Sequence, residues 1–197
     1  MADELPAYDA VVQRQRGLWS GLGMDSNAYF GALLNSPPLA AALADLGRFI
    51  RQSHLRGSFT DAERELVDMV LTVDFDYWTI GVLHLPDALA VGVRPEAVDA
   101  LLDERPDRLR PDERQLVDYV RMVVNGTVDD PSHAALQERF GIRGALEYTG
   151  LVSFLICTWR LWQALGVEDA GRAAFIDMLS RCRTGEVALP SAHARQG

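Results

Sequence analysis

The chain has 197 residues, of which 48% are hydrophobic, so one compact domain with a sizeable core is expected rather than two large ones. Its formal net charge is -9 at pH 7, which argues against a general attraction to nucleic-acid phosphates or anionic membrane surfaces. The N-terminus carries acids where a signal peptide needs a basic start, and no stretch reaches about 18 uninterrupted apolar residues. We therefore expect a cytoplasmic protein without nucleic-acid or membrane partners.

The two cysteines, Cys157 and Cys182, lie 25 residues apart and form no Cys-x-x-Cys motif. This spacing indicates neither a disulfide framework nor a cysteine zinc site. Free cysteines are commonly buried, so the ordinary expectation is two inert thiols packed on helices.

Apolar residues recur at intervals of three and four along the chain, which predicts an all-α fold of seven or eight helices. Thr60-Asp61-Ala62-Glu63 is a capping-box sequence, and a helix should start there. The stretch 145–165 is apolar on nearly every side, which predicts a central buried helix. We interpret residues 1–27 as an N-terminal arm, 28–167 as the main helical domain and 168–197 as a C-terminal helix and tail.

A short internal repeat is also visible. Residues 63–70 and 113–120 agree at six of eight positions, which suggests that one helical unit is used twice. Glu65 in the first copy corresponds to Gln115 in the second. A carboxylate chemistry at this position can therefore operate in the first copy only.

Glu65 and His84 are the first candidates for chemistry. If the helix that starts at Thr60 turns back near residues 74–76, the two lie about nine or ten residues either side of the turn, at matching heights on antiparallel helices. A carboxylate in contact with an imidazole orients the ring and raises its pKa, which suits proton transfer. The alternative is that the two side chains form a structural hydrogen bond.

Two neighbouring aromatic residues, Trp78 and Tyr77, are able to wall a pocket for a planar or cyclic ligand, although aromatics at such places are often plain core. Asp74 and Asp76 together with His84 form a weak metal-ligand pattern, because their spacing matches no recognised motif. We predict no metal site.

Several segments, taken in order, resemble the carboxymuconolactone decarboxylase family within the AhpD-like superfamily. The most specific element is Glu65, followed 19 residues later by His84, which itself precedes Gly92 by eight residues. The likeness extends over about residues 28–167, and its segments are 29–39, 59–71, 84–93, 109–124 and the apolar helix that closes at 164–167.

The resemblance implies an AhpD-like helical domain and a cofactor-independent, decarboxylase-like lyase or a related proton-transfer enzyme. Its substrate would be a small cyclic carboxylate or lactone-like metabolite, with His84 as the catalytic acid or base and Glu65 as its partner. Redox members carry a Cys-x-x-Cys motif at the positions of Tyr77 and Ile80, so a thiol peroxidase is not expected. Decarboxylase-like members carry a Glu-Trp element just before the histidine, where this chain has Asp76 and Trp78 slightly earlier.

The resemblance also implies a homo-oligomer: a dimer, trimer or hexamer. A residue from a neighbouring subunit can complete the pocket in such oligomers, so His54 joins Trp78, Tyr77 and Asp76 as a candidate for substrate binding, with Arg51 beside it. By itself, His54 before a Gly-Ser turn is expected to be a solvated histidine at a helix end. The competing hypothesis is a catalytically silent helical oligomer that binds a ligand or a protein partner.

Overall fold

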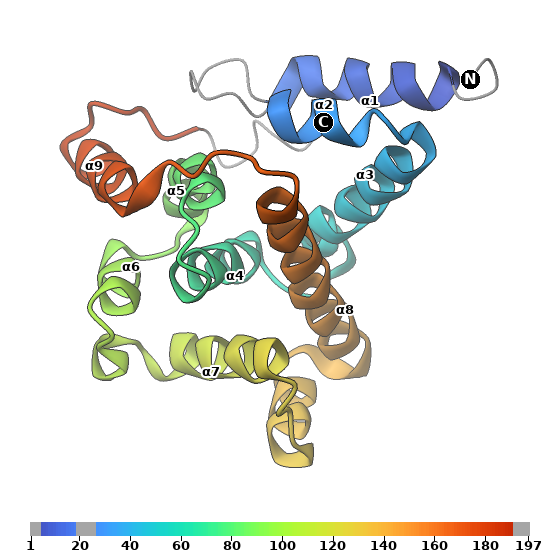
Figure 1. The fold of residues 1–197 in the computed structure, drawn as a ribbon. Helices are drawn as coiled ribbons and strands as arrows, with labels where there is room; N and C mark the ends of the chain where they lie inside the picture. The colour runs from blue at the N-terminus through green and yellow to red at the C-terminus, as the bar shows by residue number, and fades with distance from the viewer. Residues whose placement is uncertain (1–4, 19–26, 191–197) are drawn as a thin grey trace.

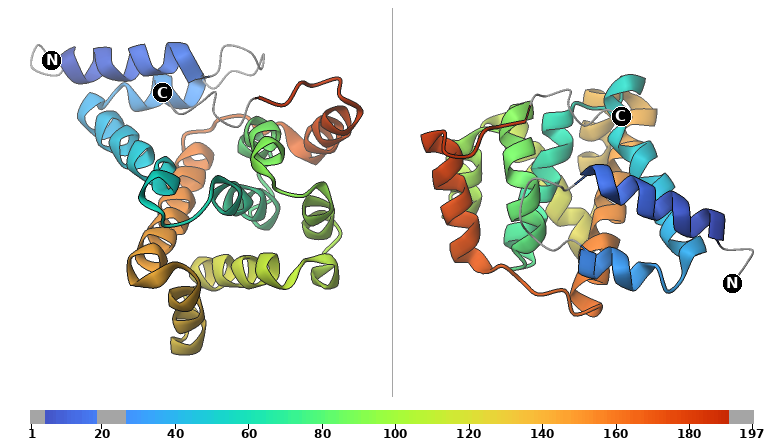
Figure 2. Two further views of the ribbon diagram at one scale, coloured as in Figure 1. Left: turned by 180° about the vertical axis from the view of Figure 1, so that it is seen from behind. Right: turned by 90° about the horizontal axis from the view of Figure 1, so that it is seen from above.

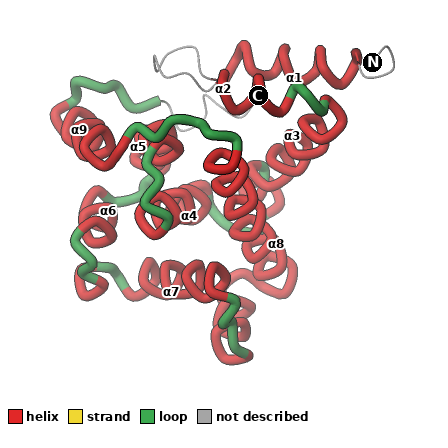
Figure 3. The backbone as a smooth tube through the Cα atoms, viewed as in Figure 1, coloured by secondary structure: helices red, strands yellow, loops and turns green. Residues whose placement is uncertain are grey.

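The structure, a computed structural model, describes residues 5–18 and 27–190, which contain helices and connecting segments but no strand (Figure 1, Figure 3). The α-helices in these residues are α1 (Leu5–Leu18), α2 (Asn27–Leu33), α3 (Pro37–Arg51), α4 (Asp61–Asp74), α5 (Thr79–Val91), α6 (Pro95–Leu102), α7 (Pro111–Asn125), α8 (Asp130–Ala164) and α9 (Gly171–Thr184). Two short 3₁₀ helices, η2 (Ser53–Arg56) and η3 (Pro106–Arg108), follow α3 and α6.

The predicted all-α class is confirmed, but the expected count of seven or eight helices is too low. The described residues alone form nine, and α1 lies within the stretch 1–27 that was interpreted as an arm. The residues of α1 are on average slightly polar and form only a weak amphipathic pattern, so the sequence gives little indication of this helix. The remainder of that stretch, 1–4 and 19–26, and the end of the predicted tail, 191–197, lie outside the described residues.

Helix α4 lies at the centre of the fold, with α5, α6, α7 and α8 packed around it (Figure 1). Its first turn is the predicted capping box, in which the Thr60 hydroxyl accepts from the Glu63 amide at 3.2 Å and the Thr60 amide donates to the Glu63 carboxylate at 2.7 Å. Every residue from Glu65 to Thr72 is buried. The central position therefore belongs to α4, and charged residues lie inside the fold.

Helices α4 and α5 form an antiparallel hairpin whose turn falls where the sequence predicted it. Helix α4 ends at Asp74, and Asp76 has a φ of 47°, in the left-handed region that usually favours glycine. Asp169, in the segment between α8 and α9, caps the first turn of α5. Its carboxylate accepts hydrogen bonds from the amides of Trp78 at 2.6 Å and Thr79 at 3.0 Å. Helix α9 packs against the outer side of α5 (Figure 2).

The two hairpin helices approach each other closely at Gly81. A Cβ atom at this position would lie 2.3 Å from Cγ2 of Thr72, so only glycine fits against α4. Residues three and four apart share a helix face, so the face of α5 with Gly81 and His84 opposes the face of α4 with Thr72 and Asp68. This contact positions the candidate site.

Helix α8 differs from the predicted central buried helix. Ala145, Tyr148 and Trp159 are fully buried, but Leu146 is 71% exposed, and Ile142, just before the predicted stretch, is 77% exposed. This helix is therefore apolar on nearly every side, but it is not buried on every side. The prediction was wrong for this face, since no described helix covers it.

One helix in the described part of the chain, α8, is long and apolar enough by length and composition to cross a membrane. A single such helix is weak evidence for a span, because the core helix of a soluble protein passes the same test.

Helix α8 is interrupted at Gly141, where φ is 72° and ψ is 171°. Past the break, Glu147 accepts hydrogen bonds from Arg56 and from Ser58, which ties α8 to the segment after α3.

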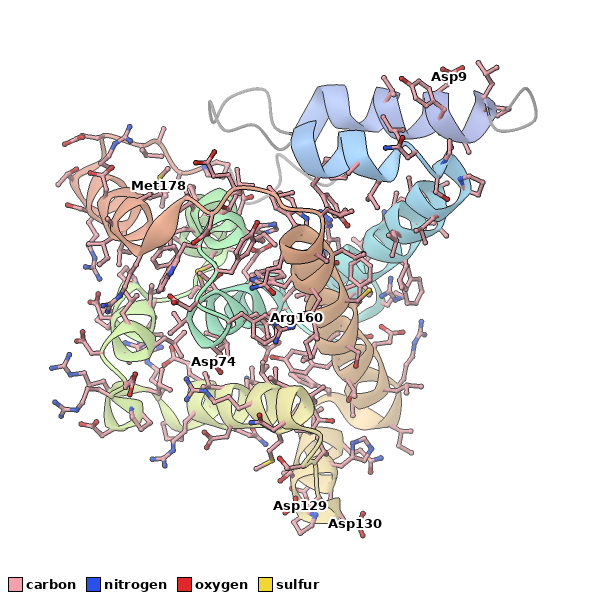
Figure 4. The ribbon with its side chains drawn as sticks, in the orientation of Figure 1. Asp9, Asp74, Asp129, Asp130, Arg160 and Met178 are labelled. Carbon is pink, nitrogen blue, oxygen red and sulfur yellow. The ribbon has the colours of Figure 1, made fainter. Side chains whose placement is uncertain are left out.

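Side-chain contacts from α7 and α8 also hold the α4–α5 turn. Asp74 lies between the end of α4 and α7 (Figure 4), where its carboxylate accepts two hydrogen bonds of 2.9 Å from Arg121. The guanidinium of Arg160 on α8 lies 4.1 Å from the ring centre of Phe75. These contacts hold the α4–α5 turn from two sides.

Replacing Gly81 by alanine should destabilise the fold, because the added methyl group collides with Thr72. We expect a loss of about 1–3 kcal/mol in the free energy of unfolding, measured by urea denaturation. The second change Thr72→Ala should restore part of that loss, since it removes the two nearest atoms. The control is Gly150→Ala on the exposed face of α8, where nothing lies within 4 Å of the new methyl group. Equal stability of the Gly81 and Gly150 variants would contradict the close approach.

Candidate functional site

Four charged residues of α4, Asp61, Arg64, Glu65 and Asp68, are spaced so that they share one helix face. Such a face is ordinarily solvated. Here their side chains retain only 18%, 14%, 4% and 3% of their exposure, respectively. The charged face of α4 therefore points into the protein, toward η2 and α5.

The predicted contact between Glu65 and His84 is present. Nδ1 of His84 lies 3.0 Å from Oε2 of Glu65, and the imidazole is 18% exposed. With an ionised Glu65, Nδ1 carries the proton and donates this hydrogen bond. The contact thus orients the ring through one nitrogen, which is the arrangement required of an acid or base that acts through the other, Nε2.

Arg64 holds the other oxygen of Glu65. Its Nε and Nη2 atoms donate to Oε1 at 3.2 and 2.8 Å. Its Nη1 donates to Asp61 at 2.8 Å and to the carbonyl of Arg51 at 2.9 Å. Both oxygens of Glu65 are therefore used, and the carboxylate is fixed in place.

The electrostatic balance keeps this pair ionised. Burial alone would raise the pKa of Glu65, but His84 and Arg64 outweigh it and hold the pKa at about 2. Burial alone would lower the pKa of His84, but the carboxylates of Asp68 and Glu65 outweigh it and raise that pKa above 6.5. An imidazolium beside a carboxylate is therefore the stable state between pH 4.5 and 6.5.

Asp68 is the site residue that the sequence reasoning missed. Its Oδ2 lies 3.6 Å from Nδ1 of His84, which is too long for a good hydrogen bond, and its buried Oδ1 has no hydrogen-bond partner among the described residues. Burial, reinforced by Glu65, raises the pKa of Asp68 to about 7 against the opposing effect of His84. The available signal was its position three residues after Glu65, on the same helix face.

His54 lies near the other end of the charged face. Its Nδ1 is 3.0 Å from Oδ1 of Asp61, but the two atoms are not aligned for a hydrogen bond, and both ring nitrogens are buried without one. The expected solvated helix-end histidine is therefore wrong. His54 reaches the Asp61 end of the network from its own chain, so no second subunit is needed to bring it there.

The other candidate substrate-binding residues are used elsewhere. Trp78 packs against Phe175 of α9 and donates from Nε1 to Asp76 at 2.8 Å, and the Tyr77 hydroxyl donates to the Val167 carbonyl at 2.9 Å. Trp78 also precedes His84 by six residues, which places it on a different side of α5. The geometry gives these three residues, including Asp76, a role in holding the turn rather than in lining the site.

The weak metal-ligand pattern of the sequence, Asp74 and Asp76 with His84, does not form a site. Asp74 pairs with Arg121, and Asp76 accepts a hydrogen bond from Trp78. A different set is brought together: Glu65, Asp68 and His84 each place a donor atom within 4.8 Å of the others. Two carboxylates and an imidazole can in general bind a divalent cation. Here the Arg64 guanidinium already neutralises Glu65, and its positive charge opposes the binding of a cation beside it.

The thiols and the surface hollows lie away from this site. Cys182 is buried, which raises its pKa, and Cys157 is exposed on α8, so the expectation of two packed thiols holds only for Cys182. A hollow of about 620 Å³ lies between α4, α6, η3 and α7, and one of about 380 Å³ lies between α6 and α9. Neither is lined by Glu65, Asp68 or His84.

Comparison with known proteins adds nothing to this geometry, since no family model, no curated protein and no solved structure matches the chain.

The ion pair predicts a pH window of stability. Glu65 stabilises the fold above the ordinary glutamate pKa of 4.5, and this contribution is lost as the pH falls toward about 2. His84, whose pKa is raised, contributes fully below 6.5, and its contribution is lost as the pH rises through the folded value. The pair should therefore stabilise the protein most between 4.5 and 6.5.

Glu65→Gln should accordingly lower the free energy of unfolding by about 1–3 kcal/mol within that window, because it leaves Arg64 and His84 with a neutral partner. Urea denaturation at a series of pH values measures the difference from the unmodified protein. Glu96→Gln, at a carboxylate that is 67% exposed, is the control. A loss of stability that does not vary with pH would show that the pair is not ionised.

Proposed function

We propose that this protein is a cofactor-independent proton-transfer enzyme in which His84 is the acid or base. The observation that carries the proposal is the 3.0 Å contact between Nδ1 of His84 and a Glu65 carboxylate that Arg64 fixes from the other side. A hydrogen bond that serves only to stabilise the fold does not require a connected row of three ionisable groups inside the protein, here Arg64, Glu65 and His84. A base whose ring must be oriented and whose charge must be stabilised does require them.

We propose a decarboxylase-like lyase reaction or a related isomerisation, on a small cyclic carboxylate or lactone-like substrate. In decarboxylation the bond between the ring carbon and the carboxylate breaks, CO₂ leaves, and the electron pair remains as an enolate next to a carbonyl. The proton on Nε2 of His84 then moves to that carbon, and the neutral imidazole regains a proton from solvent. Glu65 stays ionised throughout and stabilises the imidazolium through Nδ1.

The resemblance of the segments around Glu65, His84 and Gly92 to carboxymuconolactone decarboxylases supports this reaction class and an AhpD-like fold. The chain contributes its own evidence in the oriented imidazole and in the His84 side chain, which is 18% exposed. A redox reaction at the positions of Tyr77 and Ile80 is not proposed, because both side chains are buried and neither is a thiol.

The test is turnover of a panel of lactones and cyclic carboxylates, followed by ¹H NMR in D₂O to detect proton exchange next to the carbonyl. His84→Gln, which keeps an amide able to bond Glu65, should lower the rate by about 10²–10⁴-fold. His133→Gln is the matched control, since His133 lies on α8 and contacts Tyr119 and Gln137 instead. Activity that survives the change at His84 would contradict the proposed role.

A second candidate function is a helical homo-oligomer without catalysis, and the exposed face of α8 favours it. Ile142 and Leu146 are 77% and 71% exposed, and Gly150, Ser153 and Cys157 continue the same uncharged face. Exposed apolar faces on helices are typical of surfaces that associate.

Leu146→Glu should lower the molecular mass in light scattering, because it places a charge in the centre of that face. The control is Glu96→Gln, which changes a charge on the distant helix α6. A purely associative protein would also keep its assembly and its ligand binding in the His84→Gln variant. A protein that is a monomer before any substitution would contradict this second candidate and leave the first unaffected.

A further inference from the structure

We propose that Asp68 is a positioning residue that sets the proton affinity of His84 and thereby decides whether His84 acts as an acid or as a base. This inference rests on the proposed acid–base role of His84. The structural basis is that the Asp68 carboxylate faces the same ring nitrogen as Glu65, from the next turn of α4, and that its other oxygen is buried without a partner.

The first step is the contrast between the two carboxylates. Glu65 is fully bonded, since Oε1 accepts from Arg64 and Oε2 accepts from His84. Asp68 is 2% exposed, and no hydrogen bond satisfies its Oδ1. An ionised carboxylate in such a place is costly, whereas a protonated carboxyl group is less so. The two residues are therefore not equivalent, and Asp68 is the one able to gain or lose a proton near neutral pH.

The second step is the set of charges around this proton. Glu65 and Arg64 face Asp68 from α4, His84 faces it from α5, and Arg51 acts on it from the end of α3. The ring of His84 is acted on by Asp68, Glu65 and Arg51. Arg64 forms hydrogen bonds with Glu65 and Asp61 and stays charged. The charge of His84 is therefore the strongest effect on the proton affinity of Asp68 that can change during a reaction.

The consequence concerns the direction of proton transfer. With Asp68 ionised, two carboxylates stabilise the imidazolium, so the neutral imidazole of His84 is the stronger base and takes up a proton more readily. With Asp68 protonated, only Glu65 stabilises the imidazolium, and His84 gives up its proton more readily. An anionic substrate that approaches the ring raises the proton affinity of Asp68 and of His84 alike, because both effects come from the same negative charge. Protonation of Asp68 then removes one of the two protein carboxylates that stabilise the imidazolium, which makes His84 the stronger acid that protonation of an enolate requires.

The direct test is an NMR titration of His84 in the full chain after treatment with EDTA. The chain has four histidines, and the His84 signal is identified by its loss in His84→Gln. Asp68→Asn keeps the shape of the side chain but removes its charge, so the His84 midpoint should fall by about one pH unit or more. Asp118→Asn is the matched control, because Asp118 occupies the same place in the second copy of the repeat, is 47% exposed and pairs with Arg114. A His84 midpoint that is unchanged in Asp68→Asn, or equally changed in Asp118→Asn, would overturn the proposal.

One further measurement uses the unmodified protein alone, and another tests for a metal ion. In the unmodified protein, one aspartate carboxyl carbon should titrate near neutral pH, and the absence of any such signal would overturn the proposal. Addition of ZnSO₄ should leave the His84 titration in place. Tight binding of one Zn²⁺ that is lost in Asp68→Asn would assign the unpartnered oxygen to a metal ion and also overturn it.

Once a substrate is found, Asp68→Asn should move the limb of the pH–rate profile that belongs to His84 to lower pH. Asp118→Asn should leave that limb unchanged. Failure of the proposed function and failure of this inference give different results. If no substrate is turned over but the His84 midpoint still falls in Asp68→Asn, the proposed enzymatic function is wrong and the coupling between Asp68 and His84 stands. If a substrate is turned over but the pH–rate profile is the same in Asp68→Asn, the enzymatic function stands and the coupling is wrong.

Discussion

The burial of the charged face of α4 is the constraint on which the rest of this structure depends. Removing carboxylates and a guanidinium from water costs several kcal/mol per ion unless each finds a partner with good geometry. Arg64 meets that requirement for Asp61 and Glu65 together, and His84 supplies the second partner of Glu65. The site is therefore also the main polar element of the core, and its geometry cannot change without an effect on folding.

The packing around this face explains how it is maintained. The absence of a side chain at Gly81 allows α5 to approach α4 at Thr72, and His84 follows one turn later on the same face. Asp169 fixes the start of α5, and the left-handed conformation of Asp76 makes a tight turn without glycine. Residues of the α4–α5 hairpin and of the segment before α9 thus act together on one distance of 3.0 Å.

Much of the architecture was predictable from the sequence, and the reasons are local. The helix class follows from apolar periodicity, the start of α4 from the Thr60 capping box, and the contact between Glu65 and His84 from their distances to a shared turn. The burial of individual faces was not predictable in the same way, because it depends on which helices pack together. The exposed side of α8, the inward position of Asp68 and the distance of Trp78 from His84 all follow from that packing.

The internal repeat shows why the charged residues alone do not define a site. Helix α7 repeats the pattern of α4, and Glu113 accepts from the Arg110 amide at 2.9 Å as Glu63 does from Thr60. Asp118 nevertheless stays at the surface, and Gln115, which replaces Glu65, bonds the Ala135 carbonyl at 3.3 Å. The second copy lies at the edge of the fold, where a carboxylate can be hydrated and needs no histidine. Nearly the same eight residues therefore form an ordinary helix surface in α7 and a largely buried network of ionisable groups in α4, and the difference is their position in the fold.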